Sequence, residues 1–358
     1  MSDVAQLREY ALVHARSQGI GADVHGPVLD GIDNDVDGAE GSWALAWSRV
    51  AADAERRGEL LDAVRLYNLA RFPYVDGPVR QEAHARAVAA FDTWRQAATD
   101  IQFLELDLPG GRLRAWSAGL SATERRPLVI LMGGIVSTKE SNAPALTDAD
   151  MLGVAAIATE IPGIGENGLA YGPESWRMLP DLLDAVADRA DVTQTYALTL
   201  SFSGHLALRA AAADPRIRGV VTTGAPVHDF FTDAEWLAQV PRITLDTLAQ
   251  LTGAKVADLP HHLRGWAIPD ALLAGLDIPV AYAASRRDEI IPPGDVARLR
   301  RHLSRLEVLE KDDVHGSPRH VDEVRLWTVL TLLRFRGVTG PVVDGLTAAL
   351  EAARTKEH

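Results

Sequence analysis

Three local signals follow one another in the segment Tyr196-Ala-Leu-Thr-Leu-Ser201-Phe-Ser-Gly-His205-Leu-Ala-Leu-Arg-Ala210. Its apolar start predicts a buried strand, its small polar residues predict a tight turn, and its alanine- and leucine-rich end predicts a helix. Ser201 lies at the apex of this strand–turn–helix unit. Such a turn holds a serine hydroxyl clear of its neighbours, and the helix N-terminus beneath it favours negative charge. We therefore expect the rest of the chain to position or cover Ser201.

Strand-like and helical runs alternate on both sides of this segment. The run 127–132 is wholly apolar, which is typical of a strand buried on both faces of a sheet. A hairpin at 101–116 precedes it. The further strand-like runs are 154–160, 195–200, 219–223, 278–285 and 306–311. This alternation predicts the α/β fold class, with a mostly parallel sheet covered by helices on both faces.

Two parts of the chain are helical without such strands. Residues 1–98 are expected to form a helical N-terminal cap module, which also offers a surface for a homodimer. Residues 230–276 are expected to form a helical lid insertion over the carboxyl ends of the strands, where open α/β sheets bind ligands. Residues 99–229 and 277–358 then form the two parts of the core, the second with C-terminal helices. The predicted helices of the cap module are Val4–Ala15, Trp43–Arg56, Glu59–Ala70 and Val79–Ala97, with a Gly- and Asp-rich loop at Gly19–Gly41.

The composition excludes several classes of partner. A net charge of −13 repels phosphates, so we expect neither nucleic acid nor an anionic membrane surface as a partner, but a small-molecule substrate. No apolar run approaches the roughly 20 residues of a membrane span, and the start of the chain lacks the features of a signal peptide. The absence of cysteine fits a cytoplasmic location. Abundant alanine and a preference for arginine over lysine are typical of a GC-rich bacterial genome.

We expect neither a metal nor a cofactor. The pair His261-His262 has no acidic or histidine partners at metal-binding spacing, and we interpret it as a surface pair. The glycines of Thr159-Glu-Ile-Pro-Gly-Ile-Gly165-Glu are too few and wrongly spaced for a dinucleotide-binding turn, and no phosphate-binding loop of the Walker type occurs.

A nucleophilic serine needs a base and an acid that orients the base. Asp288 lies in the loop after the predicted strand 278–285, and His315 follows the predicted strand 306–311. The order serine, acid, histidine is one that serine enzymes of α/β type use. Because the carboxyl ends of parallel strands meet at one edge, we predict Ser201 as nucleophile, Asp288 as orienting acid and His315 as base.

Other acidic residues compete for the role of Asp288. Glu289 is the alternative in the same loop, although its side chain is expected to point the opposite way on an extended chain. Asp312 and Asp313 precede His315 and are either solvated loop charges or its direct partners. The histidine itself has the alternative interpretation of an ordinary loop residue.

A glycine-rich segment, Gly133-Gly-Ile-Val-Ser-Thr-Lys-Glu140, follows the buried strand at 127–132. Glycines there let backbone N–H groups approach a developing oxyanion. The predicted donors are the amide of Ile135 or its neighbour and the amide of Phe202, and Gly134 is a candidate pocket residue. A plain glycine turn is the alternative interpretation.

The segment Gly224-Ala-Pro-Val-His228-Asp229-Phe-Phe231 ends another predicted strand, so it is expected near the same rim. His228, Asp229 and Phe230 are candidate residues of the substrate pocket. A helix cap is an equally good interpretation of Asp229, and packing of a lid hinge on the core is an equally good interpretation of Phe230.

These features resemble the α/β-hydrolase superfamily, and within it the group of 2,6-dihydroxypseudooxynicotine hydrolase, fermentation-respiration-switch esterase-like proteins and fungal pigment chain-shortening hydrolases. The resemblance covers nearly the whole chain and is weakest in the first 40 residues. It implies an α/β-hydrolase fold whose N-terminal module closes over a Ser–His–Asp site made by Ser201, His315 and Asp288. It also implies substrates that are esters, or aromatic and polyketide-like ketones cleaved at carbon–carbon bonds. The segments that carry it are Gly133–Glu140, Ser201–Ala211 with Pro215-Arg216, Asp288–Pro292, His315 and Gly58–Pro73.

The turn departs from the family's pattern of glycine, any residue, serine, any residue, glycine. Thr199 and Ser203 stand where the glycines are expected, and Thr199 adds β-branched bulk beside a strained turn. Ser203 is also a rival nucleophile, but that role would put His205 where a small residue is needed, so we prefer Ser201.

The sequence leaves three functions open. The first is a serine-dependent hydrolase that cleaves a small apolar ester or ketone, in specialised or polyketide metabolism. The second is a lyase that uses the same pocket to eliminate acetate or another acyl group from an acetylated polyketide or tetronate, as relatives of this fold do. The third is a binding protein on a degenerate hydrolase fold, which the altered turn allows.

Overall fold

The computed structural model describes residues 3–356 and contains, in this part of the chain, an eight-stranded sheet. Its strand order is β1-β2-β4-β3-β5-β6-β7-β8. The strands are β1 (Gln102–Leu108), β2 (Gly111–Ala118), β3 (Pro127–Met132), β4 (Ala155–Thr159), β5 (Asp191–Leu200), β6 (Ile217–Thr223), β7 (Val280–Ser285) and β8 (Leu306–Lys311). Neighbours from β4 to β8 run parallel, and the β1–β2 hairpin joins β4 as an antiparallel edge. The predicted α/β fold with a mostly parallel sheet is confirmed.

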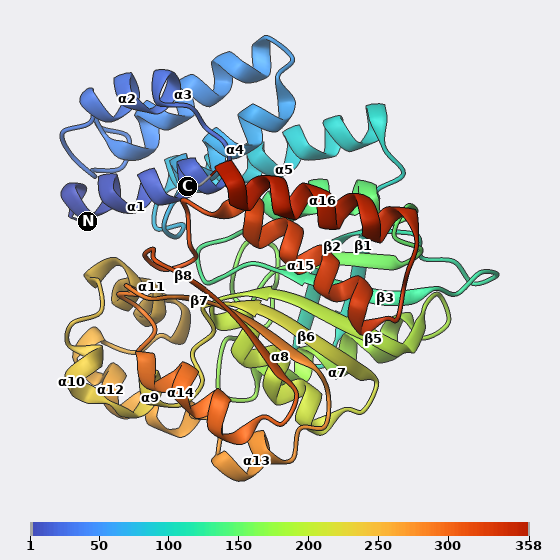
Figure 1. Cartoon of the computed structure of the whole chain (residues 1–358). Helices are drawn as coiled ribbons and strands as arrows, with labels where there is room; N and C mark the ends of the chain where they lie inside the picture. The colour runs from blue at the N-terminus through green and yellow to red at the C-terminus, as the bar shows by residue number, and fades with distance from the viewer. Residues whose placement is uncertain (1–2, 357–358) are drawn as a thin grey trace.

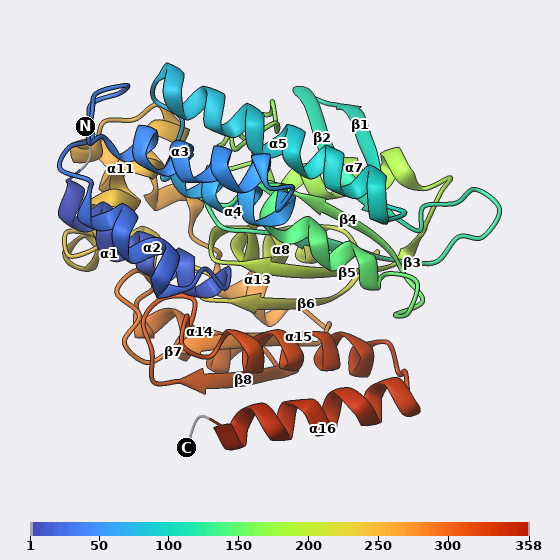
Figure 2. The ribbon, with the colours of Figure 1, turned by 90° about the horizontal axis from the view of Figure 1, so that it is seen from above.

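Helices cover both faces of this sheet (Figure 2). They are α7 (Met178–Val186), α8 (Phe202–Ala213) and α14 (Pro293–His302) on one face, and α15 (Val321–Phe335), followed by α16 (Pro341–Lys356), on the other. Along β3, Leu128 and Ile130 pack with the apolar core on the side of α7, α8 and α14. Val129 between them packs with the core on the side of α15. The strand is therefore apolar on both sides because both faces of the sheet are buried.

Five N-terminal helices lie across the sheet as a separate layer, above it in Figure 1. They are α1 (Val4–Ser17), α2 (Ala22–Asp30), α3 (Trp43–Arg56), α4 (Leu60–Arg71) and α5 (Pro78–Ala98), and we call them the cap helices. Their apolar faces form a core of their own around Trp43, Trp47 and Tyr67. No helix within residues 3–356 is long and apolar enough to cross a bilayer.

Helix α2 corrects one prediction, because it occupies part of the segment 19–41 that we expected to be a loop. Gly26 and Pro27 lie inside this helix and conceal it in the sequence, since both residues are poor helix formers. Val28 and Leu29 are buried in the core of the cap helices. The helix therefore depends on tertiary packing and not on local propensity.

The segment between β6 and β7 is also helical, in short pieces. Its helices are α9 (Asp229–Thr232), α10 (Ala234–Leu237), α11 (Arg242–Thr252), α12 (Leu259–His262) and α13 (Asp270–Ala274). We call residues 230–276 the insertion. The insertion contacts α1, because Ile243 packs into the core of the cap helices and its N–H donates to Gln6 Oε1 at 3.1 Å.

Helix α8 begins so close to the sheet that only glycine fits at Gly204. A Cβ atom there would overlap the side chain of Thr222 and lie 2.6 Å from Cβ of Ala225. This contact fixes the distance between the start of α8 and β6, and with it the position of Ser201 in the turn before the helix.

Gly204→Ala should lower the free energy of unfolding by about 1–3 kcal/mol, because the added methyl group overpacks the helix–sheet contact. Urea denaturation measures the change. The control is Gly345→Ala in α16, where a Cβ atom meets nothing within 4 Å and should stabilise the helix by about 0.5–1 kcal/mol. A Gly204→Ala protein as stable as the parent would contradict the close-packing argument.

Candidate active site

Ser201 occupies a strained turn between β5 and α8. Its backbone has φ 58° and ψ −127°, in a region that residues other than glycine rarely adopt. The turn is held by hydrogen bonds from Ser201 N to Thr223 O at 2.7 Å and from Gly204 N to Ser201 O at 2.8 Å. A serine in this conformation presents its hydroxyl group at the carboxyl edge of the sheet.

The structure brings Ser201, His315 and Asp288 together. His315 Nε2 lies 3.0 Å from Ser201 Oγ, and His315 Nδ1 lies 3.0 and 2.9 Å from the two oxygens of Asp288. Asp288 Oδ1 also accepts the N–H groups of Ile290 and Ile291, which fixes the carboxylate. These contacts join three loops that follow β5, β7 and β8.

The imidazole of His315 is partly buried beside two carboxylates. Burial by itself favours the neutral ring, but the negative charge and hydrogen bond of Asp288, together with the charge of Glu289, raise the pKa of His315 above its usual value. The ring is therefore more basic than a free histidine, because the negative charge of Asp288 favours its protonated form.

Gly224 allows this close approach, although no role could be assigned to it from the sequence. Its φ of 60° is in the left-handed region, and a Cβ atom there would lie 2.7 Å from Cε1 and 3.1 Å from Nδ1 of His315. Any side chain would push the imidazole away from Asp288. The only signal in the sequence was a glycine placed directly after a predicted core strand.

The glycine-rich segment after β3 lies against Ser201. A Cβ atom on Gly134 would lie 3.2 Å from Cβ of Ser201, so the backbone passes directly beside the serine. We call residues 133–138 the oxyanion loop, after the role that the sequence predicts for this segment. Ile135 is buried, and its N–H has no acceptor among the described residues. Phe202 is the first residue of α8, so its N–H has no partner within the helix. Two backbone donors are thus available next to Ser201.

The altered turn is accommodated by hydrogen bonds. Ser203 is fully buried, its hydroxyl group accepts the N–H of Leu200 at 3.0 Å, and the carbonyl groups of Met132 and Leu200 lie 3.0 and 2.9 Å away as acceptors. Thr199 Oγ1 lies 3.3 Å from Val221 O. The hydroxyl of Ser203 is therefore engaged with backbone, and His315 contacts Ser201 and not Ser203.

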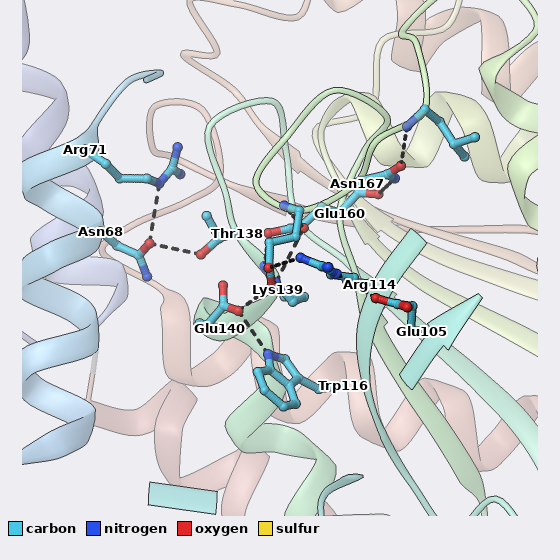
Figure 3. Close-up of polar contacts among 12 residues, drawn as sticks. Asn68, Arg71, Glu105, Arg114, Trp116, Thr138, Lys139, Glu140, Glu160 and Asn167 are labelled. Carbon is cyan, nitrogen blue, oxygen red and sulfur yellow. Dashed lines mark hydrogen bonds and ion pairs between the residues drawn. The ribbon is translucent and has the colours of Figure 1, made fainter. Parts of the chain in front are cut away.

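A buried ion cluster lies at the far end of the oxyanion loop (Figure 3). Lys139 is fully buried, and its Nζ lies 2.8 Å from Glu140, 2.8 Å from Glu166 and 3.9 Å from Glu160. Glu160 accepts the backbone N–H groups of Lys139 at 3.0 Å and of Glu166 at 3.1 Å. Trp116 Nε1 donates to Glu140 at 3.0 Å. The cluster therefore ties the segment after the oxyanion loop to β2 and to the loop after β4.

Burial and the charges of this cluster shift the pKa values of its members. Burial raises the pKa of Glu160 to about 7, because the repulsion of Glu140 adds to it and the attraction of Lys139 only partly offsets it. The surrounding carboxylates raise the pKa of Lys139 and keep it charged in spite of its burial. The cation is thus shared among three carboxylates.

Helix α4 holds the oxyanion loop from the other side (Figure 3). Thr138 Oγ1 donates to Asn68 Oδ1 at 2.9 Å, and Asn68 Nδ2 donates to Ser141 Oγ at 3.2 Å. The guanidinium group of Arg71 donates to the carbonyl oxygen of Val136. Asn68 and Arg71 are both buried. The cap helices therefore contribute directly to the position of the oxyanion loop.

The other candidate pocket residues make different contacts. His228 Nδ1 lies 3.0 Å from Asp229 Oδ1, which also accepts from Arg298 at 3.0 Å. Asp229 is the first residue of α9. Phe230 is fully buried, and its ring packs edge-on against Phe202 at 5.2 Å between centroids. The described contacts of these residues do not include Ser201 or His315.

Two of the acidic residues considered in place of Asp288 make other contacts. Asp313 is buried and accepts the N–H groups of Val314 at 2.9 Å and Arg319 at 2.7 Å, so it stabilises the loop that carries His315. Asp312 forms an ion pair with Arg287 at the surface. No three histidine, aspartate or glutamate side chains gather at metal-binding distance within residues 3–356.

A cavity of about 470 Å³ lies behind the turn, on the α15 side of the sheet. Its walls combine apolar and polar residues, and Thr199 and Leu200 of β5 form part of them. Ser201 itself does not line this cavity. The remaining walls include Val129, Leu131, Ala156, Leu198 and Leu332.

Lys139→Met should lower the free energy of unfolding by about 3–5 kcal/mol, because three carboxylates then lose the cation that they share. Denaturant unfolding measures the change. The control is Arg112→Gln, which removes an exposed ion pair with Asp107 and should cost less than about 1 kcal/mol. Equal effects of the two substitutions would show that the buried cluster contributes no more than a surface ion pair.

Comparison with known proteins identifies the family of the chain. A model of the Esterase FrsA-like family matches residues 33–268. An Esterase FrsA of Photobacterium profundum is 22% identical over 279 residues. The alignment covers 70% of this chain and 66% of that esterase, so the chain spans just under two thirds of the esterase's length. An Esterase FrsA of Vibrio vulnificus is 22% identical over 320 residues, covering 82% of this chain and 77% of that esterase.

Two solved structures have the same fold over most of the chain. The wild-type structure of AbyA5 superposes with a TM-score of 0.94, at 52% sequence identity, over 98% of this chain and 99% of that protein. The 2,6-dihydroxy-pseudo-oxynicotine hydrolase superposes with a TM-score of 0.71, at 18% identity, over 90% of this chain and 96% of that protein. The family model covers more than half of the residues, so the chain belongs to the FrsA-like esterase family, within the α/β-hydrolase superfamily.

Proposed function

We propose that this protein is a serine hydrolase that cleaves a small, largely apolar ester, or a ketone at a carbon–carbon bond. The observation that carries the proposal is the line of contacts from Ser201 Oγ through the imidazole of His315 to the carboxylate of Asp288. Membership in the FrsA-like esterase family supports ester cleavage. By the resemblance drawn from the sequence, polyketide-type esters and ketones are the substrates to test first.

In this mechanism, Ser201 Oγ attacks the carbonyl carbon of the substrate while His315 Nε2 takes the hydroxyl proton. Asp288 holds the ring and stabilises the imidazolium. The N–H groups of Ile135 and Phe202 stabilise the negative oxygen of the tetrahedral intermediate. His315 then returns the proton to the leaving group, and a water molecule activated by the same histidine releases the acyl group from Ser201.

The cap helices and the insertion cover this site in the proposed function. Gln6 of α1 and Ile243 of the insertion contact each other, so the two covers meet. The insertion then acts as the lid over the carboxyl edge of the sheet, where parallel α/β sheets bind their ligands. Apolar residues near the serine, such as Ile135 and Phe202, favour an apolar substrate.

Ser201→Ala should reduce turnover of p-nitrophenyl acetate by roughly 10³-fold or more, because the nucleophile is lost. The parent protein should also react covalently with a fluorophosphonate probe at Ser201, detected by mass spectrometry. Ser203→Ala is the matched control and should keep the nucleophile. Unchanged turnover in Ser201→Ala would remove Ser201 from the mechanism, and absence of turnover in the parent protein would favour a binding protein.

Hydrolysis and elimination are separated by heavy-oxygen water. Attack of Ser201 on an acetyl group gives an acyl-enzyme, so one solvent oxygen should enter each released acetate. Elimination, in which His315 removes a proton from carbon, breaks the alkyl–oxygen bond and transfers no solvent oxygen to acetate. Mass spectrometry of the acetate released from an acetylated polyketide substrate decides between the two reactions, and unlabelled acetate would make this enzyme a lyase.

The pH dependence should follow His315, which must be neutral to accept a proton. Burial lowers the pKa of His315, but Asp288 and Glu289 raise it by more. We therefore expect kcat/KM to fall as the pH is lowered, with a midpoint above the pKa of a free histidine. Initial rates between about pH 5 and pH 9 measure the midpoint. A midpoint at or below that of a free histidine would contradict the assignment of His315 as base.

A further inference from the structure

Helix α1 reaches the loop that carries the orienting acid. The hydroxyl group of Tyr10 donates to Glu289 Oε1 at 3.2 Å. This helix precedes the residues 33–268 that the family model matches. A residue from the start of the chain therefore contacts the residue that directly follows Asp288.

The second oxygen of Glu289 contacts His315. Glu289 Oε2 accepts the backbone N–H of His315 at 3.0 Å, while Asp288 accepts the ring N–H of the same residue. Asp288 thus contacts the side chain of His315, and Glu289 contacts its main chain. The next two residues, Gly316 and Ser317, both have positive φ values, so the chain turns sharply directly after this hydrogen bond.

Other charged groups surround His315. Glu289 and Asp288 face it from the loop after β7, and His14 faces it from α1. His14 is partly buried near Arg71 of α4, and desolvation together with the charges of Arg71 and His315 lowers its pKa to about 4. His14 is therefore neutral near pH 7, and Asp288 and Glu289 are the negative groups beside His315.

We propose that Glu289 and Tyr10 are positioning residues for the base, with Glu289 fixing the backbone of His315 and Tyr10 fixing Glu289 from the cap helices. This inference rests on the proposed role of His315 as base. In this arrangement α1 completes the active site and does not merely cover it.

Two substitutions separate the effect of the negative charge of Glu289 from the effect of its side-chain length. Glu289→Gln keeps the size of the side chain and an acceptor oxygen but removes the negative charge. The midpoint of the acidic limb of kcat/KM should then move to lower pH by about one unit, because the imidazolium loses a stabilising charge. Glu289→Asp keeps the charge but is too short for both hydrogen bonds, so it should lower kcat with a smaller change of the midpoint.

Tyr10→Phe removes only the hydroxyl group that holds Glu289. It should lower kcat roughly tenfold with little change in KM, the size expected for losing a hydrogen bond to a charged group. The matched control is Tyr67→Phe, which removes a similar hydrogen bond at 2.7 Å to Glu55 within the cap helices. Tyr67→Phe should leave kcat and the pH profile unchanged. Equal kcat values for Tyr10→Phe, Tyr67→Phe and the parent would overturn the proposal.

A measurement without turnover distinguishes this proposal from the proposed function. The imidazole of His315 can be titrated by NMR in the Ser201→Ala protein, with and without Glu289→Gln. A lower pKa in the double variant supports the placement of Glu289 even if the reaction is not a hydrolysis, and an unchanged pKa overturns it. Urea denaturation of each variant confirms that the folded protein was compared.

Discussion

The conformation of Ser201 depends on how closely the surrounding backbone can approach it. A serine with φ 58° persists only when its neighbours hold it there, and its own backbone is held by hydrogen bonds with the main chain of Thr223 and Gly204. Gly134 passes beside the serine, Gly204 brings α8 onto β6, and Gly224 admits the imidazole of His315. At each position an added methyl group would come closer to a neighbouring atom than an ordinary van der Waals contact allows. The geometry of the site therefore depends on glycines at these three positions as well as on the side chains of the site.

The oxyanion loop is held from two sides by different parts of the molecule. On one side, Lys139 and its carboxylates anchor the loop to the sheet. On the other side, Asn68 and Arg71 anchor it to α4. Backbone donors stabilise a transition state best when they do not have to reorganise, and two independent anchors limit such movement. The buried charges therefore limit the movement of a neighbouring loop, although that loop contains no charged residue.

The succession of strands along the chain and the meeting of Ser201, Asp288 and His315 could be predicted from the sequence. Both follow from local patterns, since apolar runs mark the strands and each of these residues lies in the loop or turn after one of them. Roles for Gly224, Lys139 and Tyr10 could not be assigned, because their partners are far away in the chain and lie in no regular spacing. Helix α2 was missed for a related reason: its glycine and proline hide it, and only packing against other helices stabilises it.

The two contacts of α1 have a consequence for how a substrate reaches the serine. Gln6 joins this helix to the insertion, and Tyr10 joins it to Glu289 beside the base. Any movement that separates α1 from the rim of the sheet also withdraws the hydroxyl group from Glu289. In the proposed function, α1 therefore links the cover of the site to the position of His315.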